Sequence, residues 1–151
     1  SMSRLEKVDE MIKKCANAAA MALDCTVTLT FGLSDFADMV RNYPLENKIT
    51  ELMAGYGLKV GDVPPASGSS DVGNISYRCP AMQSMLSITD ENFALHTRDF
   101  RDATLKPKAH DAMAKGACCL ADLSLKIFND DSFRSTVYEA WQKELKNKQS
   151  D

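Results

Sequence analysis

The residues best able to do chemistry lie in one short run and in one histidine about twenty positions beyond it. Ser67 to Ser76 reads SGSSDVGNIS, which joins turn-forming Gly and Ser to an acid, Asp71, at a loop-to-helix junction. Backbone N–H groups at such a junction point outward and favour an anion. We expect His96 in a loop after a buried strand, where α/β proteins usually bind ligands. The two features together predict a ligand site.

Each feature taken alone also has a plainer interpretation. Ser67 to Ser76 has the composition of a flexible linker, and a lone histidine is more often structural than a ligand. For Asp71 we favour a helix cap over direct chemistry, and Asn74 could be a polar support inside the same turn. His110 is expected on the surface of a helix.

A serine hydrolase is a second way to combine these residues. It would use Ser69 or Ser70 with His96 and Asp71. The run lacks the G-x-S-x-G elbow, and Asp71 adjoins the serine, whereas a triad acid orients the histidine. The pattern therefore disfavours this mechanism.

The composition excludes several functional classes. The 151 residues suit one domain, and a net charge of −3 with no basic stripe argues against a nucleic-acid partner. No apolar run reaches the roughly 18 residues that span a bilayer, and no signal peptide is recognisable, so we expect no membrane association and a cytoplasmic location. The five cysteines form no C-x-x-C pair, which favours reduced thiols and gives no support to a structural zinc knuckle.

The hydrophobic pattern at the start predicts a helix followed by a strand. A capping box at Ser3 and Glu6 opens a helix to about Leu23. Its apolar face recurs at steps of three and four residues: Leu5, Val8, Ile12, Cys15, Ala19 and Ala22. Thr26 to Phe31 then alternates Thr with Val, Leu and Phe, which predicts a half-buried strand. One strand needs neighbours, so this opening should belong to a larger layer.

The rest of the chain predicts further helices around one more strand. We expect a short helix or turn over Asp35 to Tyr43, a helix beginning at Pro44, helical turns over Asp71 to Arg78, a strand over Ala81 to Ile88, a loop over Asp90 to Lys106, a helix over Lys108 to Phe128, and a last helix capped by Asp130 to Ser132. In the long helix the expected core face is Ala109, Met113, Gly116, Ala117, Leu120, Leu123 and Ile127. The predicted fold class is α/β, with a mostly parallel sheet flanked by helices.

The motifs in this order strongly resemble those of peptidase family M-twenty, the metal-dependent amidohydrolases and dipeptidases. That family reads G-S-T-D-x-G-N-V-S, then x-x-P, then H-T-x-E-F. Here GSSDVGNIS stands at 68–76, Pro80 follows, and HTRDF stands at 96–100. The resemblance extends over nearly the whole chain.

The resemblance implies two parts of an aminoacylase-like enzyme. Residues 3–31 look like the last helix and strand of an α+β lid or dimerisation domain. Residues 32–148 look like the C-terminal half of a zinc-peptidase-like catalytic domain. We therefore expect the chain to be a C-terminal fragment. We also expect an exposed apolar edge at Thr26 to Phe31 to recruit a second chain, giving a homo-oligomer.

The resemblance also implies an activity: hydrolysis of amide or peptide bonds in small substrates, such as N-acyl amino acids or dipeptides, by a metal-activated water. His96 matches a metal-ligand position, and the residues that would face the substrate are Gly68, Ser69, Ser70, Asp71 and Asn74. The full-length protein would hold a pair of zinc ions, or manganese or cobalt. The chain has no H-x-D run and no adjacent Glu pair, so alone it should bind zinc weakly or not at all and be inactive. The alternative is a noncatalytic interaction module or partner subunit that keeps the fold without the metal site.

Overall fold

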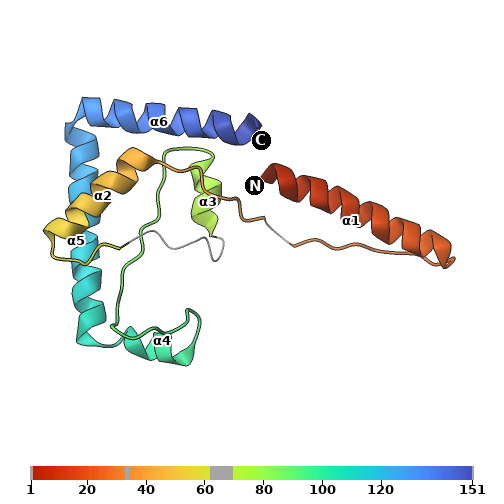
Figure 1. Ribbon diagram of the computed structural model, residues 1–151, viewed down its shortest axis with the longest axis horizontal. Helices are drawn as coiled ribbons and strands as arrows, with labels where there is room; N and C mark the ends of the chain where they lie inside the picture. The colour runs from red at the N-terminus through yellow and green to blue at the C-terminus, as the bar shows by residue number, and fades with distance from the viewer. Residues whose placement is uncertain (1, 33–34, 62–69, 151) are drawn as a thin grey trace.

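The fold, seen in a computed structural model that describes residues 2–32, 35–61 and 70–150, is helical (Figure 1). Its described residues form six helices and no β-strand: α1 Met2–Ala22, α2 Tyr43–Gly55, α3 Asp71–Ser76, α4 Arg98–Ala103, α5 Pro107–Asn129 and α6 Asp131–Ser150. The predicted α/β fold with a mostly parallel sheet is therefore wrong. The division of the chain at residues 31 and 32 stays a prediction.

Both predicted strands are wrong as strands. Thr26 to Phe31 and Ala81 to Ile88 carry no regular secondary structure, and no backbone hydrogen bond joins either segment to another described segment. Alternation of polar and apolar residues describes only the side chains. A strand also needs a neighbouring strand to pair with its backbone N–H and C=O groups. Neither segment has that neighbour within the described chain.

The core lies where α2, α5 and α6 pack against one another (Figure 1). Its buried members are Leu45, Ile49, Cys119, Leu123 and Val137. Asn42 caps α2 by accepting a hydrogen bond from the Leu45 N–H at 3.2 Å, and its Nδ2 donates to the Val137 carbonyl at 2.9 Å. The predicted helix beginning near Pro44 is confirmed, and this fully buried Asn joins it to α6.

The long helix α5 is confirmed, but its buried face differs from the predicted one. Ala109, Gly116 and Leu123 are buried as expected. Met113 and Leu120, predicted to be in the core, are 66% and 52% exposed. Their burial was expected against a sheet, and the described residues contain no sheet.

The first helix is also confirmed, and the burial of its apolar face is not. Leu5, Val8 and Ile12 are 37%, 48% and 46% exposed. The helix starts at Met2, so Ser3 lies inside it and is not its cap. In Figure 1 α1 projects away from the packed helices α2, α5 and α6. Its apolar face is exposed because no layer of the described chain lies against it.

Two connecting regions differ from expectation as well. The short helix or turn predicted over Asp35 to Tyr43 is wrong, because residues 35–42 have no regular secondary structure and Tyr43 begins α2. The expected loop over Asp90 to Lys106 contains the short helix α4, whose first turn is capped by Thr97. The predicted cap of the last helix is confirmed, since the Asp130 carboxylate accepts a hydrogen bond from the Phe133 N–H at 2.9 Å.

Candidate functional site

The Ser-rich run leads into α3, and only part of it can be described. Gly68 and Ser69, predicted to bind substrate, lie outside the described residues. Ser70 precedes α3 with extended backbone, and its hydroxyl donates to Oε1 of Gln83 at 2.8 Å. Asp71 is exposed and occupies the first helical position, so it follows the cap position held by Ser70. Its carboxylate suits the positive end of the helix dipole.

Asn74 uses both ends of its side chain to hold the extended segment 35–42. Its Oδ1 accepts a hydrogen bond from the Ala37 N–H at 2.8 Å, and its Nδ2 donates to the Asp35 carbonyl at 2.9 Å. Gly73 lies against the same segment, because a Cβ there would be 1.8 Å from the Ala37 carbonyl oxygen. The middle of the motif therefore packs on the chain itself.

Ser76 connects the same extended segment to the last helix. Its buried hydroxyl accepts from the Val40 N–H at 2.9 Å and donates to the Gly73 carbonyl at 2.6 Å. Its carbonyl accepts a hydrogen bond from Nε1 of Trp141 at 2.7 Å. The GNIS end of the motif thus joins three segments that are far apart in sequence.

His96 lies in a tight turn immediately before α4. The turn is held by Thr97, whose hydroxyl donates to the Ala94 carbonyl at 2.7 Å and accepts from the Phe100 N–H at 3.2 Å. His96 is exposed and has φ +63°, the left-handed region that non-Gly residues rarely adopt. Such a backbone conformation costs about 1 kcal/mol or more, which the hydrogen bonds of Thr97 in the same turn help to offset.

The structure does not bring His96 together with Ser70 to Ser76, the described part of the Ser-rich run. Figure 1 places α4 at the end of the molecule where α5 begins, and α3 toward α2 and α6. No hydrogen bond among the described residues links His96 to Ser70 or Asp71, so the serine-hydrolase arrangement gains no support. His110 is exposed on α5, as expected.

The described side chains can be searched for a set of residues that could bind a metal ion. Over residues 2–32, 35–61 and 70–150, no group of three or more His, Cys, Asp or Glu side chains could hold a metal ion. Catalytic zinc takes three protein ligands and structural zinc four. His96 by itself therefore does not fit a metal pair, and no chemical step through a metal follows from these residues.

No pattern in the sequence indicates the ionic cluster around Asp38. Burial raises the pKa of this carboxyl, but the hydrogen bond and charge of Lys148, helped by the Tyr77 hydroxyl at 3.1 Å, lower it by more. The cluster ties segment 35–42 to α6. A related pair joins α2 to α5, where a hydrogen bond to Asp122 raises the pKa of Tyr56 to about 12. Both groups lie outside any recognisable motif.

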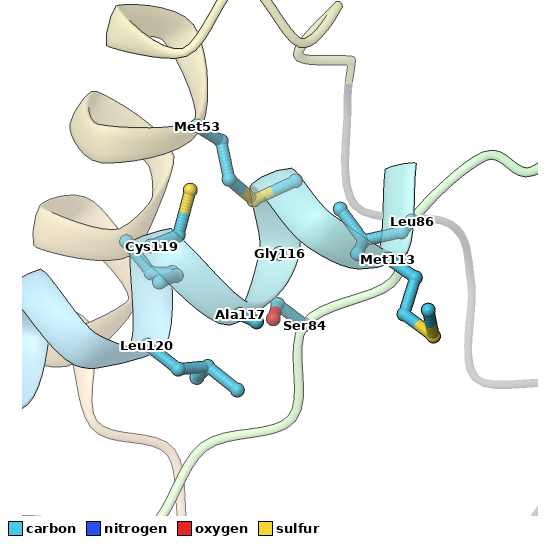
Figure 2. A pocket seen from close by; sticks show the side chains of 9 residues that line it. Met53, Ser84, Leu86, Met113, Gly116, Ala117, Cys119 and Leu120 are labelled. Atoms are coloured by element: carbon cyan, nitrogen blue, oxygen red, sulfur yellow. The ribbon is translucent and has the colours of Figure 1, made fainter. Parts of the chain in front are cut away.

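An apolar hollow of about 340 Å³ lies on the exposed side of α5 (Figure 2). Its walls come from α2, from α5 and from the extended segment 81–88 that crosses α5 near Gly116. The lining residues are Ile49, Met53, Ser84, Leu86, Met113, Gly116, Ala117, Cys119 and Leu120. With only a hydroxyl and a thiol among these side chains, the hollow offers no set of polar groups that could carry out a reaction.

Comparison with known proteins gives a distant similarity to dipeptidases. No protein-family model matches the chain. The mouse Xaa-Arg dipeptidase is 26% identical over 152 residues, which cover 98% of this chain and 34% of the mouse protein. The human Xaa-Arg dipeptidase is 25% identical, covering 99% of this chain and 35% of the human protein. The chain spans about a third of the length of these relatives. None of its described helices is long and apolar enough to cross a membrane.

Proposed function

We propose that this chain is the distal part of a metal-dependent hydrolase of peptidase family M-twenty, acting on amide or peptide bonds of small substrates. The observation that carries the proposal is the similarity to Xaa-Arg dipeptidases across nearly the whole chain. The motifs at 68–76 and 96–100 support the finer assignment to this family. N-acyl amino acids and dipeptides are the substrate class, and the cytoplasm is the expected location.

In this proposal His96 supplies one ligand of a metal pair. Its exposed position in the turn before α4 leaves the imidazole accessible to ligands from another part of a longer protein. Ser70 and Asp71 would lie beside the substrate, where backbone N–H groups could bind a carboxylate. Asn74 would act indirectly, because both ends of its side chain hold residues 35–37.

The decisive experiment is a hydrolysis assay on the complete protein that the gene of this chain encodes. A panel of N-acyl amino acids and dipeptides, including dipeptides that end in Arg, is incubated with added zinc or manganese. We expect hydrolysis of at least one member and its loss with a chelator. An absence of chelator-sensitive hydrolysis across the panel would contradict the proposal.

Two histidine variants sharpen the assay. His96→Ala should abolish activity, because the metal pair would lose one of its ligands. His110→Ala should retain activity. Both side chains are exposed, so the pair is matched in residue type and accessibility. Equal activity of the two variants would remove His96 from the proposed metal site.

The isolated chain gives a second, independent test. Calorimetry with zinc should show weak binding or none, because His96 is the one residue that matches a ligand position. A zinc site of micromolar affinity or tighter that is lost in His96→Ala would show that the chain carries a complete ligand set. In that case the expectation that the isolated chain lacks most of the metal site would be wrong.

A further inference from the structure

Ser70 occupies the cap position of α3, but its hydroxyl does not cap the helix. A serine at this position ordinarily accepts a hydrogen bond from an N–H group of the first helical turn. Here the side chain makes no such bond, and its hydroxyl donates to Oε1 of Gln83 at 2.8 Å. Gln83 lies 13 residues further along the chain. The orientation of the Ser70 hydroxyl is therefore set by Gln83 and not by the helix.

Gln83 lies on the open side of segment 81–88. Its neighbours Met82 and Leu86 turn inward, since Met82 packs against the buried cluster and Leu86 lines the hollow on α5. Side chains of an extended chain alternate between two faces, which places Gln83 opposite Met82. Gln83 is exposed and Ser70 is half-buried. A molecule in solution can therefore reach both side chains.

The direction of this hydrogen bond determines what the two side chains can still bind. Because the Ser70 hydroxyl gives its hydrogen to Gln83, its oxygen can only accept a further hydrogen bond. The amide of Gln83 uses its oxygen, so its Nε2 keeps two hydrogens to donate. Among the residues that the structure describes, none forms either of these further bonds. The pair therefore offers one acceptor and one donor close together.

This combination matches the amino-acid end of an N-acyl amino acid or a dipeptide. There an amide N–H and a carboxylate belong to the same residue, and in an extended conformation they point to the same side, as in paired strands. A carboxylate alone would leave the acceptor unpaired, and an ammonium group alone would leave the donor unpaired. A polar group left without a partner in a complex costs affinity, so a ligand that satisfies both groups is favoured.

We propose that Ser70 and Gln83 together determine substrate specificity. Oγ of Ser70 accepts the amide N–H of the substrate, and Nε2 of Gln83 donates to the carboxylate of the same amino-acid unit. The inference rests on the proposed function, because it needs a substrate beside α3. It adds Gln83, which lies outside the motifs at 68–76 and 96–100, and it gives the side chain of Ser70 a specific role. Neither residue takes part in bond cleavage.

Gln83→Glu tests the donor in the complete protein. The variant keeps an oxygen for the Ser70 hydroxyl and puts a negatively charged oxygen where the amide nitrogen was. For a panel substrate with a free carboxylate, KM should rise at least about tenfold while kcat changes less than about twofold, because like charges oppose each other. For the same substrate with a carboxamide in place of its carboxylate, the KM of the variant should stay within about twofold of the wild-type value.

The matched control is Gln142→Glu, the same change on an exposed residue of α6. It alters the net charge equally and should leave KM for both substrates unchanged. Circular dichroism shows whether each variant keeps its helices. If Gln83→Glu raises KM equally for the carboxylate and the carboxamide, Gln83 only supports the fold and the specificity assignment is wrong.

Ser70→Ala tests the acceptor by a measurement that needs no turnover. Calorimetry with the chelator-treated complete protein gives the Kd of N-acetylarginine and of its analogue with an ester oxygen in place of the N–H. Ser70→Ala should raise the Kd of the amide at least about fivefold and leave that of the ester within about twofold, because the ester has no N–H to donate. The variant should keep α3, since the hydroxyl does not cap it. Equal weakening of both ligands, or of neither, overturns the proposal.

The two measurements separate this inference from the proposed activity. Hydrolysis with an unchanged KM in both Gln83→Glu and Ser70→Ala would leave the hydrolase standing and remove the specificity pair. Binding that depends on both residues, without chelator-sensitive hydrolysis of any panel member, would keep the pair and contradict the hydrolase. A wild-type protein that neither binds nor hydrolyses these compounds contradicts both.

Discussion

Asn74, Gly73 and Ser76 show how residues of a motif can serve the chain that carries them. Their hydrogen bonds and close contacts go to residues 35–40, back into α3 and to Trp141 of α6. The sequence predicted Asn74 as a substrate contact or a polar support within its own turn. Neither a family pattern nor a spacing rule could indicate its actual partners, because they lie 37 and 39 residues away.

The close approach of α3 to segment 35–42 can be tested by a substitution at Gly73. Gly73→Ala should destabilise the protein by about 1–3 kcal/mol, because the new Cβ would overlap the Ala37 carbonyl, and backbone cannot move aside as a side chain can. Urea denaturation followed by circular dichroism measures the change. The control is Gly55→Ala, where no atom lies within 4 Å of the added Cβ. Equal losses in both variants would contradict the close approach.

The carboxyl of Asp38 makes the folding stability of the protein depend on pH. Its pKa in the folded protein lies below its ordinary value of 3.8, since Lys148 and Tyr77 outweigh the effect of burial. The stability from this group is therefore complete above the ordinary value and is lost as the pH falls through the lowered folded value.

Asp38→Asn should accordingly be less stable than wild type at neutral pH, and the difference should shrink in acid below about pH 4. Urea midpoints across the pH range measure it, with Glu139→Gln, an exposed residue of α6, as the control. A gap between Asp38→Asn and wild type that stays constant with pH would show that the carboxylate charge contributes nothing.

At the scale of elements, the longer helices were predictable, whereas the short helix α4 was missed and both strands were wrong. The apolar faces of α2, α5 and α6 are local signals, because a helix satisfies its own backbone. The segments 26–31 and 81–88 carry strand-like patterns, but pairing depends on residues elsewhere. The same dependence explains Met113 and Leu120, whose burial was expected against a sheet that the described chain does not contain.

The contact of α5 with segment 81–88 gives a test at this scale. A Cβ on Gly116 would lie 2.4 Å from Cδ1 of Leu86, the movable end of a half-buried side chain. Gly116→Ala should therefore change stability by less than about 1 kcal/mol, since the gain in helix propensity offsets the displacement of Leu86.

In a Leu86→Ala background that displacement disappears. Gly116→Ala should then stabilise the protein by up to about 1 kcal/mol, measured as a double-mutant cycle in urea. If Gly116→Ala behaves identically in both backgrounds, the two residues do not contact each other in solution.

At the scale of the whole molecule, the chain has a packed part and a projecting part. Helices α2, α5 and α6 share the buried cluster, while α1 joins no element of the described chain through an extensive contact (Figure 1). An isolated helix of this length is marginal in water, so α1 depends on whatever packs against it.

Hydrogen exchange should separate the two parts. In dilute solution the amides of α1 should exchange much faster than those of α5, because opening α1 breaks few buried contacts. Mass spectrometry of peptides from each helix measures the rates. Equal protection of α1 and α5 under dilute conditions would mean that α1 packs on its own chain.

The fluorescence of Trp141 should report on the contact between α3 and α6. It is the only tryptophan in the sequence, it is 8% exposed, and its indole N–H donates to the Ser76 carbonyl. Indole emission shifts to the red when water reaches the excited ring. Intrinsic fluorescence should therefore report the separation of α6 from α3, and the shift should come early if that contact opens before the α2–α5 core.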